Sequence, residues 1–323
     1  MDRRSFLHTS AAVGLAAAAS PTLFAQAETP IAIIDTHQHL WDLTQFQPPW
    51  LDDASPVIAQ SHTIQHYLQA IQGLNITKAI YMEIDVAPAQ HEKEIQHVIR
   101  MAENENHMTV AGVVSGRPAE ETFGAYIRKY SDCKAIKGVR QVLHASTPAG
   151  FCLGRQFVAS MNLLAEMDFS FDLCMRPTEL DDAFALAKQC PNTKFILDHC
   201  GNADPKAFLS EQAGGNQKAN HTIEEWKTGI SRLATLDNMI CKISGIIARV
   251  PETWSSDLLA PIVNHCLDEF GEDRVVFGSD WPVCKLGASL KDWVTALREI
   301  VSNRTVAQQQ KLFHGNAQRF YLV

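Results

Sequence analysis

The sequence predicts a single (β/α)8 barrel, the TIM-barrel architecture, because strand-like and helix-like segments alternate along nearly its whole length. The strand-like runs are apolar throughout instead of alternating with polar residues, as expected for a parallel sheet covered on both faces. They are rich in β-branched and aromatic residues and occupy positions 31–36, 78–86, 108–115, 135–142, 169–175, 194–199, 239–245 and 274–280.

Amphipathic segments between these runs predict the helices. They lie at 62–74, 89–104, 178–189, 223–236, 256–270 and 290–300. A doubly wound open sheet is the alternative, but no Gly-rich phosphate-binding turn follows the first strand. Two longer loops, 41–61 and 202–222, leave the C-terminal ends of the first and sixth strands. We expect them to form walls or a lid of the pocket.

The first 27 residues have the pattern of an export signal. Arg-Arg-Ser-Phe-Leu begins at residue 3, an Ala-rich apolar stretch follows, and Ala-Gln-Ala ends at residue 27. This segment resembles a twin-arginine signal peptide. It predicts an exported, periplasmic protein whose mature barrel domain spans residues 28–323.

Composition narrows the class of partner. The chain carries a formal net charge of -8, so nothing in its charge balance attracts nucleic acid or an anionic membrane. We therefore expect a small-molecule substrate, with no membrane contact by the mature protein and the oligomeric state left open. The eight cysteines form no CxxC pair, and four of them lie in or just after predicted strands: Cys174, Cys200, Cys241 and Cys284. Free buried thiols are favoured over the alternative of disulfides.

The first predicted strand ends in a pair of histidines, His37 and His39. Residues i and i+2 of an extended segment point to the same side, so both imidazoles can face the barrel mouth. The pair by itself is equally typical of ordinary polar residues at a strand end.

Residues at the ends of two other predicted strands indicate a function for the histidine pair. The sixth apolar run ends at His199, and Asp280 occupies the equivalent position of the eighth. Catalytic residues of such barrels come from the C-terminal ends of several strands, so we expect these four side chains to converge. Imidazole and carboxylate groups with an open position for water suit a divalent, zinc-type ion.

Four motifs carry a specific resemblance: DTHQHLWD at 35–42, KGVR at 137–140, KISG at 242–245 and FGSDWP at 277–282. With these the chain resembles the amidohydrolase superfamily. Within its second large subgroup it is similar to the branch that contains sugar lactonases such as L-fuconolactonase and L-rhamnonolactonase. The motifs extend from the first predicted strand to the last.

The resemblance implies roles for the convergent residues. His37 and His39 are implied metal or substrate ligands, His199 a third ligand or an oxyanion partner, and Asp280 a possible ligand and the base that activates water. A two-metal centre is not expected, because the fifth strand ends in Leu-Cys-Met at 173–175, without an imidazole. Lys137 is as readily a surface residue as a bridging ligand. One divalent metal, zinc, is therefore implied, with a metal-free site built from the same residues as the alternative.

Further residues near strand ends are candidates for contact with substrate. The planar guanidinium of Arg140 suits a hydroxylated or carboxylate-bearing ligand, with a salt bridge at the rim as the alternative. Glu83 is either an additional ligand or part of a structural ion pair. Lys242 interrupts an apolar run, so it needs a buried partner even if it also reaches the substrate.

Aromatic and histidine side chains extend this set. Trp41 and Trp281 offer flat faces for a sugar ring, although core packing explains either of them equally well. His144, just past the fourth strand, is a further candidate for substrate contact. His62 and His66 are expected on a solvated helix face.

These residues predict a hydrolase of a lactone, such as a sugar-acid lactone. Asp280 would take a proton from water, and histidines or a metal would polarise the carbonyl group. Two alternatives remain: a metal-dependent decarboxylase of an unsaturated or aromatic acid, and a sugar-binding protein without turnover.

Overall fold

The computed structural model describes residues 31–144, 147–209 and 219–323. Ile31–Val323 forms one compact unit. The expected signal peptide at 1–27 lies outside the described residues, as does part of the expected loop at 202–222.

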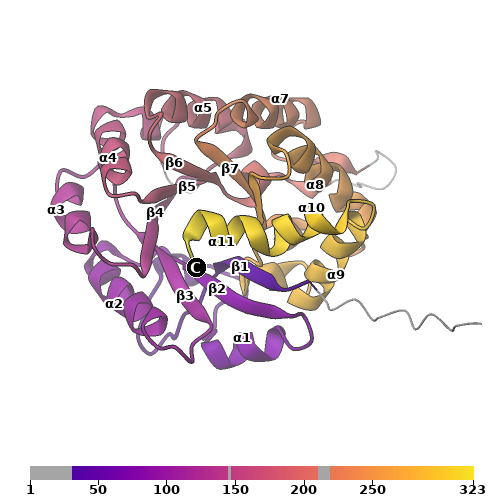
Figure 1. Cartoon of the computed structure of the whole chain (residues 1–323), viewed down its shortest axis with the longest axis horizontal. Helices are drawn as coiled ribbons and strands as arrows, with labels where there is room; N and C mark the ends of the chain where they lie inside the picture. The colour runs from indigo at the N-terminus through magenta and orange to yellow at the C-terminus, as the bar shows by residue number, and fades with distance from the viewer. Residues whose placement is uncertain (1–30, 145–146, 210–218) are drawn as a thin grey trace, which may run out of the picture. The chain divides into compact units, whose positions relative to one another are not determined.

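All eight predicted strands are present and form one parallel sheet in the order β1 to β8. Figure 1 shows them as the inner ring of the molecule, with helices around it. The predicted (β/α)8 barrel is therefore confirmed. The strands are β1 (Ile33–Gln38), β2 (Ile76–Met82), β3 (Thr109–Ser115), β4 (Ile136–Val142), β5 (Ser170–Cys174), β6 (Lys194–Leu197), β7 (Met239–Ile243) and β8 (Val275–Phe277).

The ring closes through the segment that follows β8. Gln38 forms a parallel bridge with Trp281. The backbone N–H of Asp280 donates to the carbonyl oxygen of His37 at 2.9 Å, and that of His39 donates to Trp281 at 2.8 Å. The backbone that closes the barrel therefore belongs to the predicted site.

Helices follow the strands as expected. The six predicted helices correspond to α1 (Ile64–Ala70), α2 (His91–Ala102), α5 (Leu180–Gln189), α7 (Ile223–Ala234), α8 (Ser256–Phe270) and α9 (Leu290–Ile300). Two more, α3 (Phe123–Ile127) and α4 (Arg155–Glu166), complete the units after β3 and β4, and α6 (His199–Asn202) is a short irregular turn. The chain ends in α10 (Val306–Gln310), a π-helical turn (Lys311–Gly315) and α11 (Asn316–Tyr321).

The interior is divided into two apolar clusters. The larger one lies between the strands and the surrounding helices. The smaller one fills the barrel with inward side chains such as Ile34 and Val113, and it includes Ala317 and Tyr321 of α11. Figure 1 shows α11 lying across the ring of strands. Because α11 contacts β1 and β8, it covers one end of the barrel and leaves the other for the site.

All eight cysteines are free, and seven of them are buried. The expectation of free thiols therefore agrees with the structure. Among the described helices, none is long and apolar enough to cross a membrane.

Candidate active site

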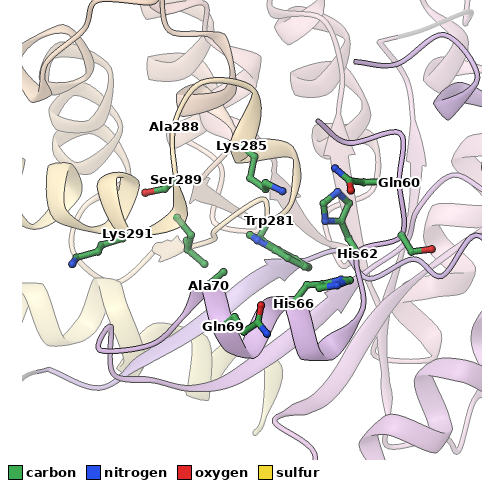
Figure 2. A pocket seen from close by; sticks show the side chains of 12 residues that line it. Gln60, His62, His66, Gln69, Ala70, Trp281, Lys285, Ala288, Ser289 and Lys291 are labelled. Atoms are coloured by element: carbon green, nitrogen blue, oxygen red, sulfur yellow. The ribbon is translucent and has the colours of Figure 1, made fainter. Parts of the chain in front are cut away.

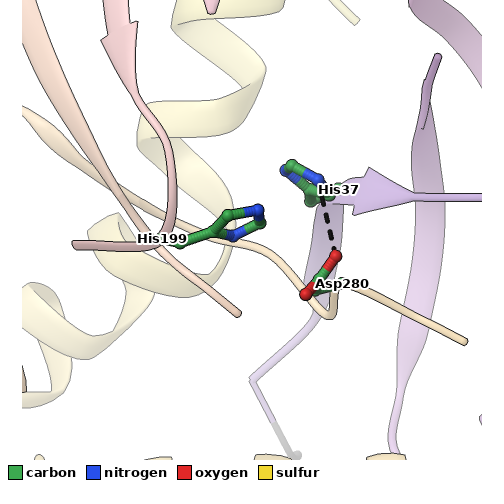
Figure 3. A group of neighbouring side chains, drawn as sticks. All are labelled: His37, His199 and Asp280. Carbon is green, nitrogen blue, oxygen red and sulfur yellow. Dashed lines mark ion pairs between the residues drawn. The ribbon is translucent and has the colours of Figure 1, made fainter. Parts of the chain in front are cut away.

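Three predicted site residues converge at the C-terminal ends of their strands. His37 lies in β1, and His199 and Asp280 follow β6 and β8. One ligand atom of each lies within 4.8 Å of the other two. Figure 3 shows both imidazoles beside the carboxylate, with Nε2 of His37 at 3.6 Å from Oδ1 of Asp280.

Backbone geometry aims two of these side chains. Strands 6 and 8 were predicted to run through His199 and Asp280, but β6 and β8 end earlier, at Leu197 and Phe277. Both residues then adopt a φ of 54°, in the left-handed region that non-glycine residues seldom occupy. Such strain persists only where the surrounding structure enforces it, and it often marks a functional position.

A glycine makes room for one of the imidazoles. A Cβ atom on Gly245 would lie 2.3 Å from Nδ1 of His199, and Gly245 itself has a φ of 68°. The hydroxyl of neighbouring Ser244 lies 2.9 Å from the same nitrogen. The KISG motif after β7 thus holds His199 in place.

His39 completes the cluster from the end of β1. Its Nδ1 lies 3.0 Å from the carbonyl oxygen of Met82, and its Nε2 lies 3.3 Å from Oδ1 of Asp280. A carbonyl oxygen only accepts, so Nδ1 carries a proton and Nε2 is the ring nitrogen that faces Asp280.

The electrostatics keep Asp280 ionised and His199 neutral. Burial alone would raise the pKa of Asp280, but His199, His39 and His37 together hold it well below its usual value. Burial lowers the pKa of His199 to about 4, despite the opposing influence of Asp280 and Asp198. At neutral pH the site therefore offers a carboxylate base beside an uncharged imidazole.

Three buried charged residues, Lys242, Asp172 and Asp198, form an ionic layer beside His37. Nζ of Lys242 lies 2.6 Å from Oδ2 of Asp172 and 3.1 Å from Oδ1 of Asp198. It also lies 3.3 Å from Nδ1 of His37, which is itself 3.5 Å from Asp198. Lys242, predicted to contact substrate, is fully buried, and here its contacts are with this layer.

Arg140 connects this layer to the mouth. Its Nε donates to Oε1 of Glu83 at 2.6 Å, and its Nη1 lies 3.2 Å from Nε2 of His37. Glu83 also accepts hydrogen bonds from the Ser115 hydroxyl and the backbone N–H of Asp85. Glu83 thus orients Arg140, as in the structural ion pair that the sequence left open.

The remaining predicted residues lie around the cluster. Trp41 is buried, and its indole N–H donates to the carbonyl oxygen of Gln60. Trp281 is also buried and lines a separate cavity, which is shown in Figure 2. His144 is exposed just after β4. Lys137 lies near the start of β4, at the opposite end of that strand from Arg140, so it cannot bridge metals in this cluster.

Sequence reasoning missed several buried carboxylates. Asp172 and Asp198 neutralise Lys242. Asp35 accepts hydrogen bonds from the Tyr67 hydroxyl and the backbone N–H of Ser279, which ties β1 to the segment after β8. The available signal was a carboxylate within an apolar run, which requires a buried partner.

The donor set is suited to one metal ion. Two atoms bound to zinc at about 2.0–2.1 Å in a tetrahedral arrangement lie about 3.3–3.4 Å apart. Oδ1 of Asp280 lies 3.3 Å from Nε2 of His39 and 3.6 Å from Nε2 of His37. Nδ1 of His39 is taken by the carbonyl oxygen of Met82, so Nε2 is the nitrogen that could bind a cation together with this carboxylate. His37, His39, His199 and Asp280 are thus the residues that could hold a divalent ion.

Comparison with known proteins shows which family this chain resembles. The amidohydrolase family profile matches residues 34–323. An uncharacterized protein of Sinorhizobium fredii is 28% identical over 310 residues, which cover 91% of this chain and 99% of that one. An L-fucono-1,5-lactonase of Burkholderia multivorans is 25% identical over 298 residues, which cover 89% and 95%. A 4-sulfomuconolactone hydrolase of Rhizobium radiobacter is 23% identical over 269 residues, covering 83% and 81%.

Solved structures share the fold. An amidohydrolase of Burkholderia multivorans, solved with bound zinc, superposes with a TM-score of 0.77 at 22% identity over 90% of this chain and 99% of that one. A 2,6-dihydroxybenzoate decarboxylase from Rhizobium superposes with a TM-score of 0.59 at 13% identity over 90% and 98%.

Proposed function

Because this chain belongs to the amidohydrolase family and is therefore an enzyme of the hydrolase type, we propose that it opens a small-molecule lactone, such as a sugar-acid lactone. The observation that carries the proposal is the position of Asp280, an ionised carboxylate within 3.6 Å of His37 and His39. Two relatives named for lactone hydrolysis support the choice of substrate class.

The chemistry of ring opening assigns the roles. Water must lose a proton as it attacks the ester carbonyl, and Asp280 is the base that takes this proton. The carbonyl oxygen becomes negatively charged, and His199 and Arg140 lie where their N–H groups can stabilise that charge. The proton held by Asp280 then passes to the ring oxygen as the ester bond breaks, which gives a hydroxy acid.

Other residues position this machinery. Glu83 fixes Arg140, and the layer of Lys242, Asp172 and Asp198 fixes His37. A divalent ion, proposed to be zinc, would be held by His37, His39, His199 and Asp280. When bound, it lowers the pKa of water and polarises the carbonyl group. We also propose that the enzyme acts in the periplasm, from the twin-arginine pattern of residues 1–27.

A decarboxylase is the second candidate, favoured by one observation. Arg140 donates to Glu83 through Nε and Nη2, and its Nη1 lies beside His37, where it could face a carboxylate of a substrate bound at the cluster. The fold likeness to a decarboxylase agrees with this alternative but shows the fold alone.

One experiment separates the two candidates. Purified protein is incubated with a panel of sugar-acid lactones and with a panel of dihydroxybenzoic acids. Acid release is followed with a pH indicator, and CO2 release is measured in parallel. We expect acid release from at least one lactone and no CO2. Release of CO2 without ring opening would overturn the lactonase proposal, and the absence of both would favour a sugar-binding protein.

A further inference from the structure

A second cavity lies beside the catalytic cluster. Its volume is about 550 Å³, and it lies between α1 and the segment that connects β8 to α9. Figure 2 shows the indole of Trp281 at its centre, with His62 and His66 on one side and Ser289 and Lys291 on the other. His62 was expected on a solvated helix face, but it is buried just before α1 and lines this cavity.

The charge of the cavity has one sign. Lys285 and Lys291 line it, and none of its described lining residues is acidic. Within the described part of the chain, neither lysine has an ion-pair partner. The protein as a whole carries a net charge of -8, so this cavity is a local exception that attracts anions.

The indole of Trp281 offers a further donor. Trp281 lines the cavity, and its N–H makes no hydrogen bond to another described residue. The indoles of Trp41, Trp50, Trp226 and Trp293 all donate to backbone oxygens. The N–H of Trp281 is therefore available to donate to a ligand oxygen at the cavity.

The two histidines offer opposite hydrogen-bonding groups. Nε2 of His62 lies 3.1 Å from the carbonyl oxygen of Val57, so it carries the proton and leaves Nδ1 as an acceptor. Nδ1 of His66 accepts from the backbone N–H of Thr63, which leaves Nε2 as a donor. Burial and the charge of Lys285 lower the pKa of His62 to about 4, so it remains an acceptor at neutral pH.

We propose that this cavity binds a small hydroxylated carboxylate, such as an aldonate, at a site separate from the His37–Asp280 cluster. The lysines, Trp281 and His66 donate to the carboxylate and hydroxyl oxygens, and Nδ1 of His62 accepts from a hydroxyl group. A hydroxy acid is also what lactone opening yields, so a role in sensing product rests on the proposed function. The backbone provides the connection, because Trp281 accepts from His39 and directly follows Asp280.

Calorimetric titration of the full chain at constant ionic strength tests the proposal without any turnover. The probes are gluconate, acetate, glucitol and inorganic phosphate. We expect gluconate to bind about tenfold more tightly than acetate, which lacks the hydroxyl groups, or glucitol, which lacks the charge. Phosphate binding as tightly as gluconate would overturn the assignment and leave a plain anion site.

Variants locate the binding. Lys285→Ala with Lys291→Ala, both on exposed side chains, should weaken gluconate binding about five- to tenfold. The matched pair Lys134→Ala with Lys188→Ala, also exposed, should leave it unchanged. Trp281→Phe should weaken it about threefold, the effect of losing one neutral hydrogen bond.

Equal binding by the cavity double variant and the wild type would overturn the proposal. So would loss of this binding when a lactone analogue saturates the catalytic cluster, because the gluconate would then lie in that cluster. Failure to open lactones would affect neither outcome.

Discussion

His39 and Asp280 face one another across the barrel mouth, with Nε2 of the imidazole 3.3 Å from Oδ1 of the carboxylate. The other ring nitrogen is committed to the carbonyl oxygen of Met82. Nε2 is therefore the nitrogen that can bind a metal ion shared with the Asp280 carboxylate. The backbone segment that carries Asp280 also closes the barrel, so the fold itself holds Asp280 beside His39. We therefore expect metal binding to depend on this contact.

Metal content should depend on this contact. His39→Gln should lower the affinity for zinc about 10- to 100-fold, because it removes one nitrogen ligand and its carbonyl-fixed orientation. Elemental analysis after dialysis against defined zinc concentrations measures the change. His66→Gln, on an exposed histidine, is the control and should bind as the wild type does. Identical zinc binding by wild type and His39→Gln would rule out this ligand.

The pair of Glu83 and Arg140 should be essential for stability. Glu83→Gln removes the nearer charged partner of the buried Arg140 and, among the described residues, leaves only Asp198, 3.4 Å away, so it should lower the free energy of unfolding by about 3 kcal/mol. Denaturant titration followed by circular dichroism gives the value. The control Glu92→Gln breaks an exposed pair with Lys129 and should leave the free energy of unfolding nearly unchanged. A similar small loss for both variants would contradict the assigned role.

His62 and His91 should each lose their contribution to stability as the pH falls from 7 to 5. Burial lowers the pKa of His62 and of His91 to about 4, whereas an unfolded histidine titrates near 6.5. The unfolded state therefore binds more protons in this interval, and stability is lost as the pH falls below 6.5. Each residue should contribute about 1–2 kcal/mol between pH 7 and pH 5.

Chemical unfolding at several pH values tests this dependence. His62→Gln and His91→Gln should each flatten the curve. If neither variant changed the slope, these two histidines would not be the source of the pH dependence.

The sequence predicted the strands well but their ends less well. Apolar runs identified all eight strands because both faces of the sheet are buried. The predicted runs at β6 and β8 were extended too far, because the polar turns at 198–199 and 278–280 directly follow apolar residues. The short helix α3 lacks the length that makes a helical period recognisable.

The convergent residues of the site were predictable for a related reason. His37, His39, His199 and Asp280 occupy strand ends, and parallel strands of a barrel bring their ends together. The partners below them were not predictable. Lys242 and Asp172 are 70 residues apart, and only the ring of strands brings β5 and β7 close enough for their side chains to meet.

The rate of lactone opening by Asp280→Asn tests the central claim most directly. Asparagine keeps the size of the side chain but cannot take the proton from water. We expect kcat to fall at least about 10²- to 10⁴-fold, the usual contribution of a general base, while binding of a lactone analogue persists. Ring opening at the rate of the wild type would show that another group activates the water.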